Sequence, residues 1–234
     1  MKIKRFFKTE IAKLQAMTFT EKRQYIWEYY KLHLFALAFL AILLGWFINH
    51  TFINPPKQDY LYIAWVGDEV LPDTLGEIAQ HLNVIVNDPD RQRVMVWSYA
   101  HTGNPQLDHA IQQRFAAMFH TGGIDALFAP YSDVEAFSSA AFSRGMGEVM
   151  TYVAAINPAL YAQVSSQLLS LTFTRDTGEG PEEITDYMAV SLAGTPFFDY
   201  LNFDAADVYL MPVVTTNNFE AIAKALEAIF QWNP

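Results

Sequence analysis

The stretch from Leu32 to Ile53 reads LHLFALAFLAILLGWFINHTFI, and it divides the chain into a short basic part and a long acidic part. No Asp, Glu, Lys or Arg occurs between Lys31 and Lys57. An uncharged helix of that reach spans roughly 35 Å, which exceeds the bilayer core of about 30 Å. The apolar run from Leu34 to Ile48 offers no polar face to water, so a membrane-spanning helix is favoured over a buried core helix. Because no small-x-small cleavage site follows, we expect an uncleaved signal anchor.

The distribution of charge predicts the orientation of this helix. Residues 1–31 carry eight Lys or Arg against three Glu, a net charge of +5, whereas the remainder carries seven basic and 22 acidic residues, a net charge of −15. Positive charge beside a membrane helix is retained in the cytoplasm, so we expect a cytoplasmic N-terminus and an extracellular C-terminal domain in the cell membrane. Aromatic residues suited to the membrane interface flank the helix on both sides: Tyr25, Trp27, Tyr30 and Trp46.

The chain is therefore expected to have four parts: a cytoplasmic basic amphipathic segment (1–31), a transmembrane helix (32–53), a short linker with two prolines (54–59) and one extracytoplasmic domain (60–234). In the first part, Ile3, Phe7, Ile11 and Leu14 follow helical spacing, and Thr18-Phe19-Thr20-Glu21 matches a capping box that begins a second helix. The short linker predicts that the domain works close to the bilayer, on a membrane or envelope protein.

Short apolar strands alternate with amphipathic helices in the domain. Strands are expected at 60–66, 94–99 and 124–129, each followed by a helix: one over 72–82, one capped by Asn104 with Leu107 facing inward, and one opened by a capping box from Ser132 to Glu135. The second half predicts a helix from Pro158, strands at 169–174, 187–192 and 208–214, and a last helix capped by Asn217. This order predicts an α/β fold with a mixed, mainly parallel sheet.

Composition argues against several functions. The chain has no cysteine, so it has no disulfide framework, thiol nucleophile or cysteine metal site. Its net charge of −10 disfavours nucleic acid as a partner. Asp176-Thr177-Gly178 matches the aspartic-protease tripeptide, but it occurs once, in a polar loop, and lacks the apolar surroundings of such sites. His109 and His120 share a helical face but lie roughly 16 Å apart, too far to bind one ion. We therefore expect no catalytic residues, no metal ligands and no cofactor.

Three stretches carry a resemblance to a known group of proteins: YIWEYYK (25–31) before the anchor, GIDALFAP (123–130), and YMAVSLAGT (187–195) with the segment 207–214. The chain resembles uncharacterised single-pass membrane proteins of Gram-positive bacteria, whose outer domains look like extracytoplasmic solute-binding proteins. The resemblance covers nearly the whole chain. It implies a reduced periplasmic-binding-protein-like domain, because this chain is far shorter than a full-size solute-binding protein.

Loops after the strands supply the candidate ligand-binding residues. In open parallel sheets, ligands bind beyond the carboxyl ends of the strands. This rule collects Asp68, Tyr99, Tyr131, Ser132 and Thr195, with Thr215 and Thr216 as additional candidates. Hydroxylated aromatic rings beside a carboxylate suit a small polar or cationic molecule.

Two functions follow from these expectations. The first is a membrane-anchored, non-catalytic binding module that captures a small solute or peptide for a neighbouring membrane protein. The alternative is an envelope interaction or scaffold subunit whose solute-binding-like domain has no ligand. A deep pocket lined by Tyr99 and Tyr131 would favour the first, and a filled cleft with an exposed apolar patch would favour the second.

Overall fold

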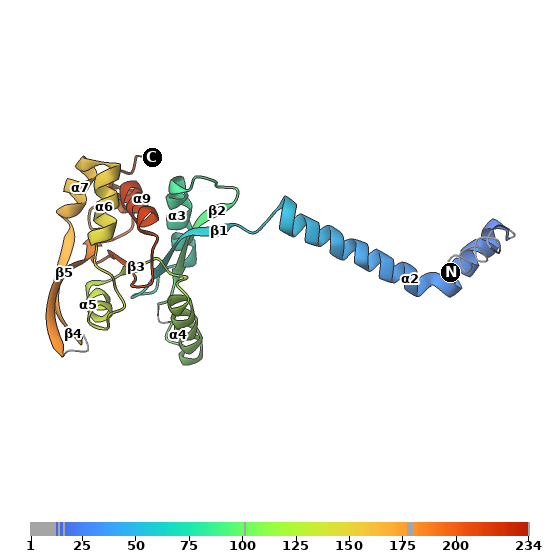
Figure 1. Ribbon diagram of the computed structural model, residues 1–234, viewed down its shortest axis with the longest axis horizontal. Helices are drawn as coiled ribbons and strands as arrows, with labels where there is room; N and C mark the ends of the chain where they lie inside the picture. The colour runs from blue at the N-terminus through green and yellow to red at the C-terminus, as the bar shows by residue number, and fades with distance from the viewer. Residues whose placement is uncertain (1–12, 14, 16, 101, 177–179, 234) are drawn as a thin grey trace. The chain divides into compact units, whose positions relative to one another are not determined.

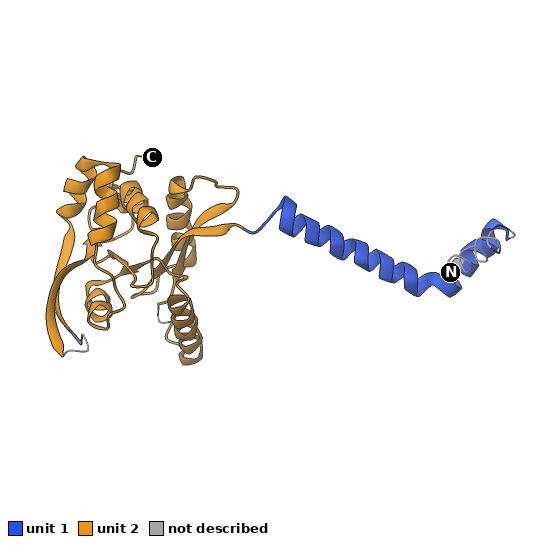
Figure 2. Cartoon of the chain, in the orientation of Figure 1, with its two compact units in different colours: residues 1–56 blue, residues 57–234 orange. Residues whose placement is uncertain are grey.

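The computed structural model describes residues 13, 15, 17–100, 102–176 and 180–233. The chain divides into two compact units, residues 1–56 and 57–234, which Figure 2 colours separately. We call the second unit the α/β domain. The amphipathic helix expected from Ile3, Phe7, Ile11 and Leu14 lies outside the described residues.

One long helix dominates the first unit. Helix α2 runs from Phe19 to Ile48 and continues into a π-helical turn, η1, over Asn49–Ile53. The expected capping box is confirmed, because the Thr18 hydroxyl accepts a bond from the Glu21 N–H while the Glu21 carboxylate accepts one from the Thr18 N–H. The 27 residues from Trp27 to Ile53 are long and apolar enough to cross a membrane. This is consistent with a single-pass anchor, and signal sequences share the same composition.

The α/β domain is built on one mixed sheet. Within the described residues the sheet has six strands in the order β2-β1-β3-β6-β5-β4 (Figure 1). Their bounds are β1 Gln58–Trp65, β2 Gln92–Ser98, β3 Ala126–Ala129, β4 Leu168–Asp176, β5 Pro181–Ser191 and β6 Tyr209–Pro212.

Only part of this sheet is parallel. Strand β1 pairs in parallel with β2 and β3, whereas β6, β5 and β4 continue the sheet in antiparallel pairs. The expectation of a mainly parallel sheet is therefore wrong. Only four residues separate the end of β4 from the start of β5, too few for a crossover between parallel strands, so these two strands run antiparallel.

Helices cover both faces of the sheet. They are α3 Pro72–Leu82 with its 3-10 extension η2 Asn83–Ile85, α4 Pro105–His120, α5 Tyr131–Ser139, α6 Gly147–Ile156, α7 Pro158–Ser165, α8 Pro196–Tyr200 and α9 Phe219–Phe230. Helices α3, α6, α7, α8 and α9 bury apolar side chains in one core, while α4 and α5 contribute to a second core on the opposite face. In Figure 1, α3 and α4 accordingly lie on opposite sides of the β1–β2 end of the sheet.

Three local expectations are wrong. Helix α5 begins one residue before Ser132, after Pro130, and its N-cap makes no side-chain hydrogen bond, so the expected capping box is absent. The N-cap of α9 is Asn218, one residue after the expected Asn217, and its amide donates instead to the Tyr60 carbonyl at 2.7 Å. Leu107, expected to face inward, is 49 % exposed. Its side chain lines a pocket beside strand β2.

Candidate functional site

The outer edge of strand β2 carries unpaired backbone groups. Strand β2 ends the sheet, with β1 as its only strand neighbour in the described chain. Its register with β1 places Val94, Val96 and Ser98 opposite Leu61, Ile63 and Trp65, and the Tyr99 N–H donates to the Trp65 carbonyl at 2.7 Å. In a parallel ladder with this bond pattern, the N–H and C=O of Val94, Val96 and Ser98 point away from β1.

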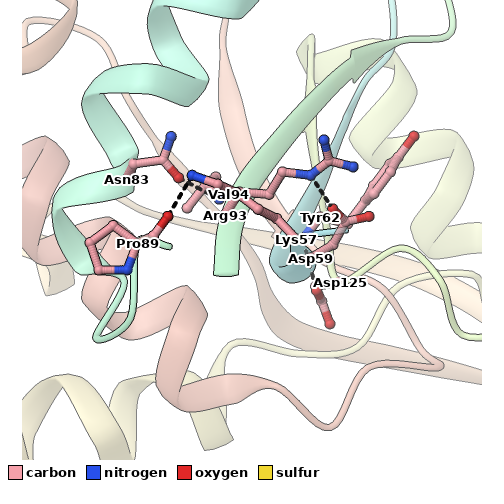
Figure 3. A network of polar contacts seen from close by, with 8 residues as sticks. All are labelled: Lys57, Asp59, Tyr62, Asn83, Pro89, Arg93, Val94 and Asp125. Atoms are coloured by element: carbon pink, nitrogen blue, oxygen red, sulfur yellow. Dashed lines mark hydrogen bonds and ion pairs between the residues drawn. The ribbon is translucent and has the colours of Figure 1, made fainter. Parts of the chain in front are cut away.

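The first part of that edge is closed by the protein itself. The Val94 N–H donates to the Asn83 side-chain oxygen at 2.7 Å, as Figure 3 shows. Beside it, Arg93 pairs with Asp59 at 2.7 Å and the Lys57 ammonium donates to the Pro89 carbonyl. Of these contacts, the Asn83–Val94 bond closes the outer edge, whereas the Arg93–Asp59 pair lies across the β1–β2 ladder.

The second part of the edge is open. Among the residues that the structure describes, the N–H and C=O of Val96 and the N–H of Ser98 have no hydrogen-bond partner. Asn83 therefore satisfies the outward-facing N–H of Val94, and the outward-facing groups of Val96 and the N–H of Ser98 are free to bind a ligand.

A pocket of about 650 Å³ lies over this open half, and we call it the β2 groove. Helix α3 forms one wall, helix α4 the other, and residues 95–100 form the floor. Small residues widen both walls: Gly76 and Ala79 on α3, and Ala110 on α4. A Cβ added to Gly76 would meet no atom within 4 Å, which shows open space in front of that residue. The volume lies within the usual range of ligand pockets.

A cation stands on the α4 wall. The Arg114 guanidinium lies 4.3 Å from the centre of the Trp97 ring, a cation–π contact that holds it beside the floor. Arg114 makes no ion pair with any other described residue, although the chain as a whole is acidic. The β2 groove therefore presents a positive charge without an ion-pair partner next to an aromatic surface, and Glu69 is the other charged residue of its lining.

Tyr99 lines the groove but keeps its hydroxyl inside the protein. The ring is buried, and its hydroxyl shares a 2.9 Å hydrogen bond with the hydroxyl of Tyr62. Burial, reinforced by this bond, raises the pKa of the Tyr62 phenol well above its usual range. The Tyr62 phenol thus stays neutral at physiological pH, and Tyr99 offers the groove its ring while its hydroxyl is bonded to Tyr62.

The other predicted ligand residues lie elsewhere. Asp68 is exposed, and its carbonyl accepts a bond from the Trp65 indole at 3.0 Å. Ser132 is exposed on α5, and Tyr131 packs against the Tyr209 ring at 6.3 Å. Thr195 is buried, with its hydroxyl donating to the Leu192 carbonyl at 2.9 Å. Of the five predicted residues, only Tyr99 lines the β2 groove.

Strand order explains this scatter. Tyr99 follows β2, Tyr131 follows β3 and Thr195 follows β5. In the sheet, β2 and β3 are two strand intervals apart, whereas β2 and β5 are four intervals apart. At about 4.8 Å per interval, the larger separation is roughly 19 Å. Thr215 and Thr216 lie at the opposite end of the sheet, because β6 is antiparallel to β3, and Thr216 bonds there to Asp125. A ligand role for the remaining predicted residues stays a prediction.

Sequence reasoning did not find the groove residues Gly76, Trp97, Leu107 and Arg114. One feature of the sequence indicates the groove: Gly76 interrupts a strong helical pattern, and a glycine there destabilises the helix by about 1 kcal/mol relative to alanine. Such a glycine is expected where a helix must leave room beside it.

The described part of the chain contains no group of three His, Cys, Asp or Glu side chains arranged to hold a metal ion. Asp176 ends β4 opposite Pro181, and the other two residues of its tripeptide lie outside the described residues. On α2, Trp27 and Trp46 are exposed, and the Trp46 ring stacks on His50 at 5.4 Å. Tyr25 packs against Tyr30 on the same helix.

No protein-family model, curated protein or solved structure matches this chain. The likeness to solute-binding proteins therefore stays a prediction.

Proposed function

We propose that this protein is a membrane-anchored, extracytoplasmic, non-catalytic binding module whose ligand lies in the β2 groove. The observation that carries the proposal is the pocket of about 650 Å³ over the open half of the β2 edge. Its ionisable lining residues are Glu69, Tyr99 and Arg114, and most of the remaining lining is apolar. Apolar walls with a few polar groups are typical of sites that bind and orient a ligand.

The alternative is an interaction or scaffold subunit without a ligand. That function would be favoured by a filled cleft, because the domain would then offer only its outer surface. The open groove supports the binding module instead.

Filling the groove is expected to abolish binding without unfolding the protein. Gly76→Leu places a side chain in the open space beside α3 and replaces a poor helix former with a good one. The full chain, purified in nanodiscs, is compared with this variant by native mass spectrometry. We expect an additional mass on the wild type, released on denaturation, and none on Gly76→Leu.

Two controls make this comparison specific. Gly147→Leu adds the same side chain at another exposed helical glycine with open space around it, and it should keep the bound mass. Gly76→Ala should keep it as well and raise the free energy of unfolding by about 0.5–1 kcal/mol. Equal loading of the wild type and Gly76→Leu, or a wild type that carries no ligand and binds no added ligand in a Gly76-dependent manner, would contradict the proposal.

Orientation can be tested by cysteine labelling, because the chain has no native cysteine. Gln24 precedes the apolar span and Gln163 lies on α7, and both are exposed. A membrane-impermeant maleimide is expected to label Gln163→Cys in intact cells and Gln24→Cys only after permeabilisation, because the basic segment stays in the cytoplasm. The reverse pattern would place the groove in the cytoplasm. Loss of the Gln24 segment from the mature chain would identify a cleaved signal sequence.

A further inference from the structure

We propose that the β2 groove binds an extended polypeptide segment, which adds to the sheet as a new strand beside β2. This inference rests on the proposed function and names the chemistry of its ligand. The occupant is a short stretch of a partner protein with apolar residues at alternate positions and an acidic group that pairs with Arg114.

The free backbone groups of β2 have the spacing of an edge that pairs with another strand. Val96 and Ser98 direct their hydrogen-bonding groups outward and are two residues apart, the repeat at which a neighbouring strand is bonded. An open sheet edge promotes unwanted association, and proteins normally block it. Here Asn83 blocks the edge at Val94 and leaves the next positions open within a recess. The edge is thus protected where no ligand is needed and free where the groove begins.

The two walls of the groove lie on opposite faces of the sheet. Side chains of a strand alternate between the two faces, so an added strand would direct one set toward α3 and the other toward α4. The α3 wall is hollowed by Gly76 and Ala79, which leaves room for an aliphatic side chain. The α4 wall offers Leu107 and Ile111 as an apolar contact. Two hollowed faces with an unpaired edge between them fit an extended peptide.

The charge of Arg114 favours a ligand that carries an acidic group. Arg114 lies on the α4 wall without a carboxylate partner among the described residues. A carboxylate on the ligand, either a side chain or a free C-terminus, would form a charge-assisted bond with its guanidinium. This requirement selects acidic peptides over basic ones.

Other occupants fit less well. A helical peptide would leave the backbone groups of Val96 and Ser98 without partners, which costs free energy once water is displaced. A second copy of this chain would bring its own α3 and α4, which flank its β2 in the same way, against these walls before the two edges could meet. An isolated segment of a partner protein reaches the edge without that obstruction.

The experiment begins with a dodecapeptide phage library panned on the full chain in nanodiscs and depleted on Gly76→Leu. We expect the enriched peptides to share apolar residues at every second position and at least one acidic residue. Synthetic copies of the strongest binder are then N-methylated at one backbone position at a time. Strand addition predicts that methylation at alternate positions weakens binding at least about tenfold, while the positions between tolerate it.

Two variants of the protein complete the test. Ser98→Pro removes an outward-facing N–H, which an edge strand tolerates, and it should weaken peptide binding about tenfold or more relative to Ser98→Ala, which also loses the hydroxyl that accepts the Ala100 N–H but keeps its own backbone N–H. Arg114→Glu should abolish the binding of acidic peptides, and Arg114→Gln should weaken this binding by a smaller factor.

The outcomes separate this inference from the proposed function. Enriched peptides with helical spacing, or with no alternation in the N-methyl series, would overturn strand addition and leave the β2 groove as a binding site. If no peptide binds the wild type more tightly than it binds Gly76→Leu, the inference that the ligand is a polypeptide would be overturned. A Gly76-dependent small molecule in the native mass spectra would then still support the binding module.

Discussion

Replacement of Phe128 by alanine is expected to lower the free energy of unfolding of the α/β domain by about 4 kcal/mol. Phe128 is fully buried on β3, the strand at which the parallel and antiparallel parts of the sheet meet. Its ring packs edge-on against Trp65 at 5.9 Å and Phe198 at 6.1 Å. Removing the ring leaves a cavity that β3, paired on both sides, cannot close.

Phe142→Ala is the matched control for this prediction. Phe142 is 41 % exposed, although its ring also contacts the Phe119 ring at 5.2 Å. Because much of that ring already faces water, its loss should cost less than half as much. Chemical denaturation of both variants, followed by tryptophan fluorescence, measures the two losses. Equal losses would contradict the central position of Phe128 in the core.

Asp125→Ala is the second large effect, with an expected loss of about 3 kcal/mol. The Asp125 carboxylate accepts the Tyr62 N–H at 2.9 Å (Figure 3) and the Thr216 hydroxyl at 3.1 Å. It therefore joins β1 to the turn that leads into α9. Alanine would leave both donors without partners in a partly buried site. Asp125→Asn keeps an oxygen for the Tyr62 N–H, so its loss should be less than half that of alanine.

The same residue predicts a pH dependence of stability. Burial raises the pKa of Asp125 above its ordinary value of 3.8, against the opposing effect of its hydrogen bonds, and nearby Asp59 adds to the rise. The folded state then binds the proton more tightly than the unfolded state. Protonated Asp125 therefore adds to the free energy of unfolding. This contribution is fully present below the ordinary pKa and is lost as the pH rises through the raised pKa of the folded state.

The difference between wild type and Asp125→Asn isolates this contribution from the other carboxylates. The free energy of unfolding of the wild type should fall relative to that of Asp125→Asn as the pH rises from about 4. The difference between the two proteins should level off once Asp125 is ionised in both the folded and the unfolded state. Paired denaturation curves across this pH range measure it. A difference that grows in the opposite direction would show that hydrogen bonding, and not burial, dominates at Asp125.

Elements with a regular apolar period could be predicted from the sequence. Helix α3 begins and ends at the expected residues, because Pro72 fixes the first turn and Leu75, Ile78 and Leu82 form one buried stripe. The Thr18 capping box was also predictable, since both of its hydrogen bonds are local. Helix α6 was not anticipated, because Gly145 and Gly147 indicate a turn and only tertiary burial of Val149 and Val153 stabilises the helix after it.

The sequence by itself determined the apolar span, the lack of thiol chemistry and the local starts and stops of most strands and helices, because these depend on residues close in the chain. Only the tertiary structure decided the strand order, the antiparallel half of the sheet and the β2 groove. The groove needs α3, β2 and α4 at one sheet edge, and whether Gly76 or Arg114 lies beside an open strand depends on pairing between distant segments. Candidates chosen by following the strands in chain order were therefore scattered along the sheet, because the order in space differs from the order in sequence.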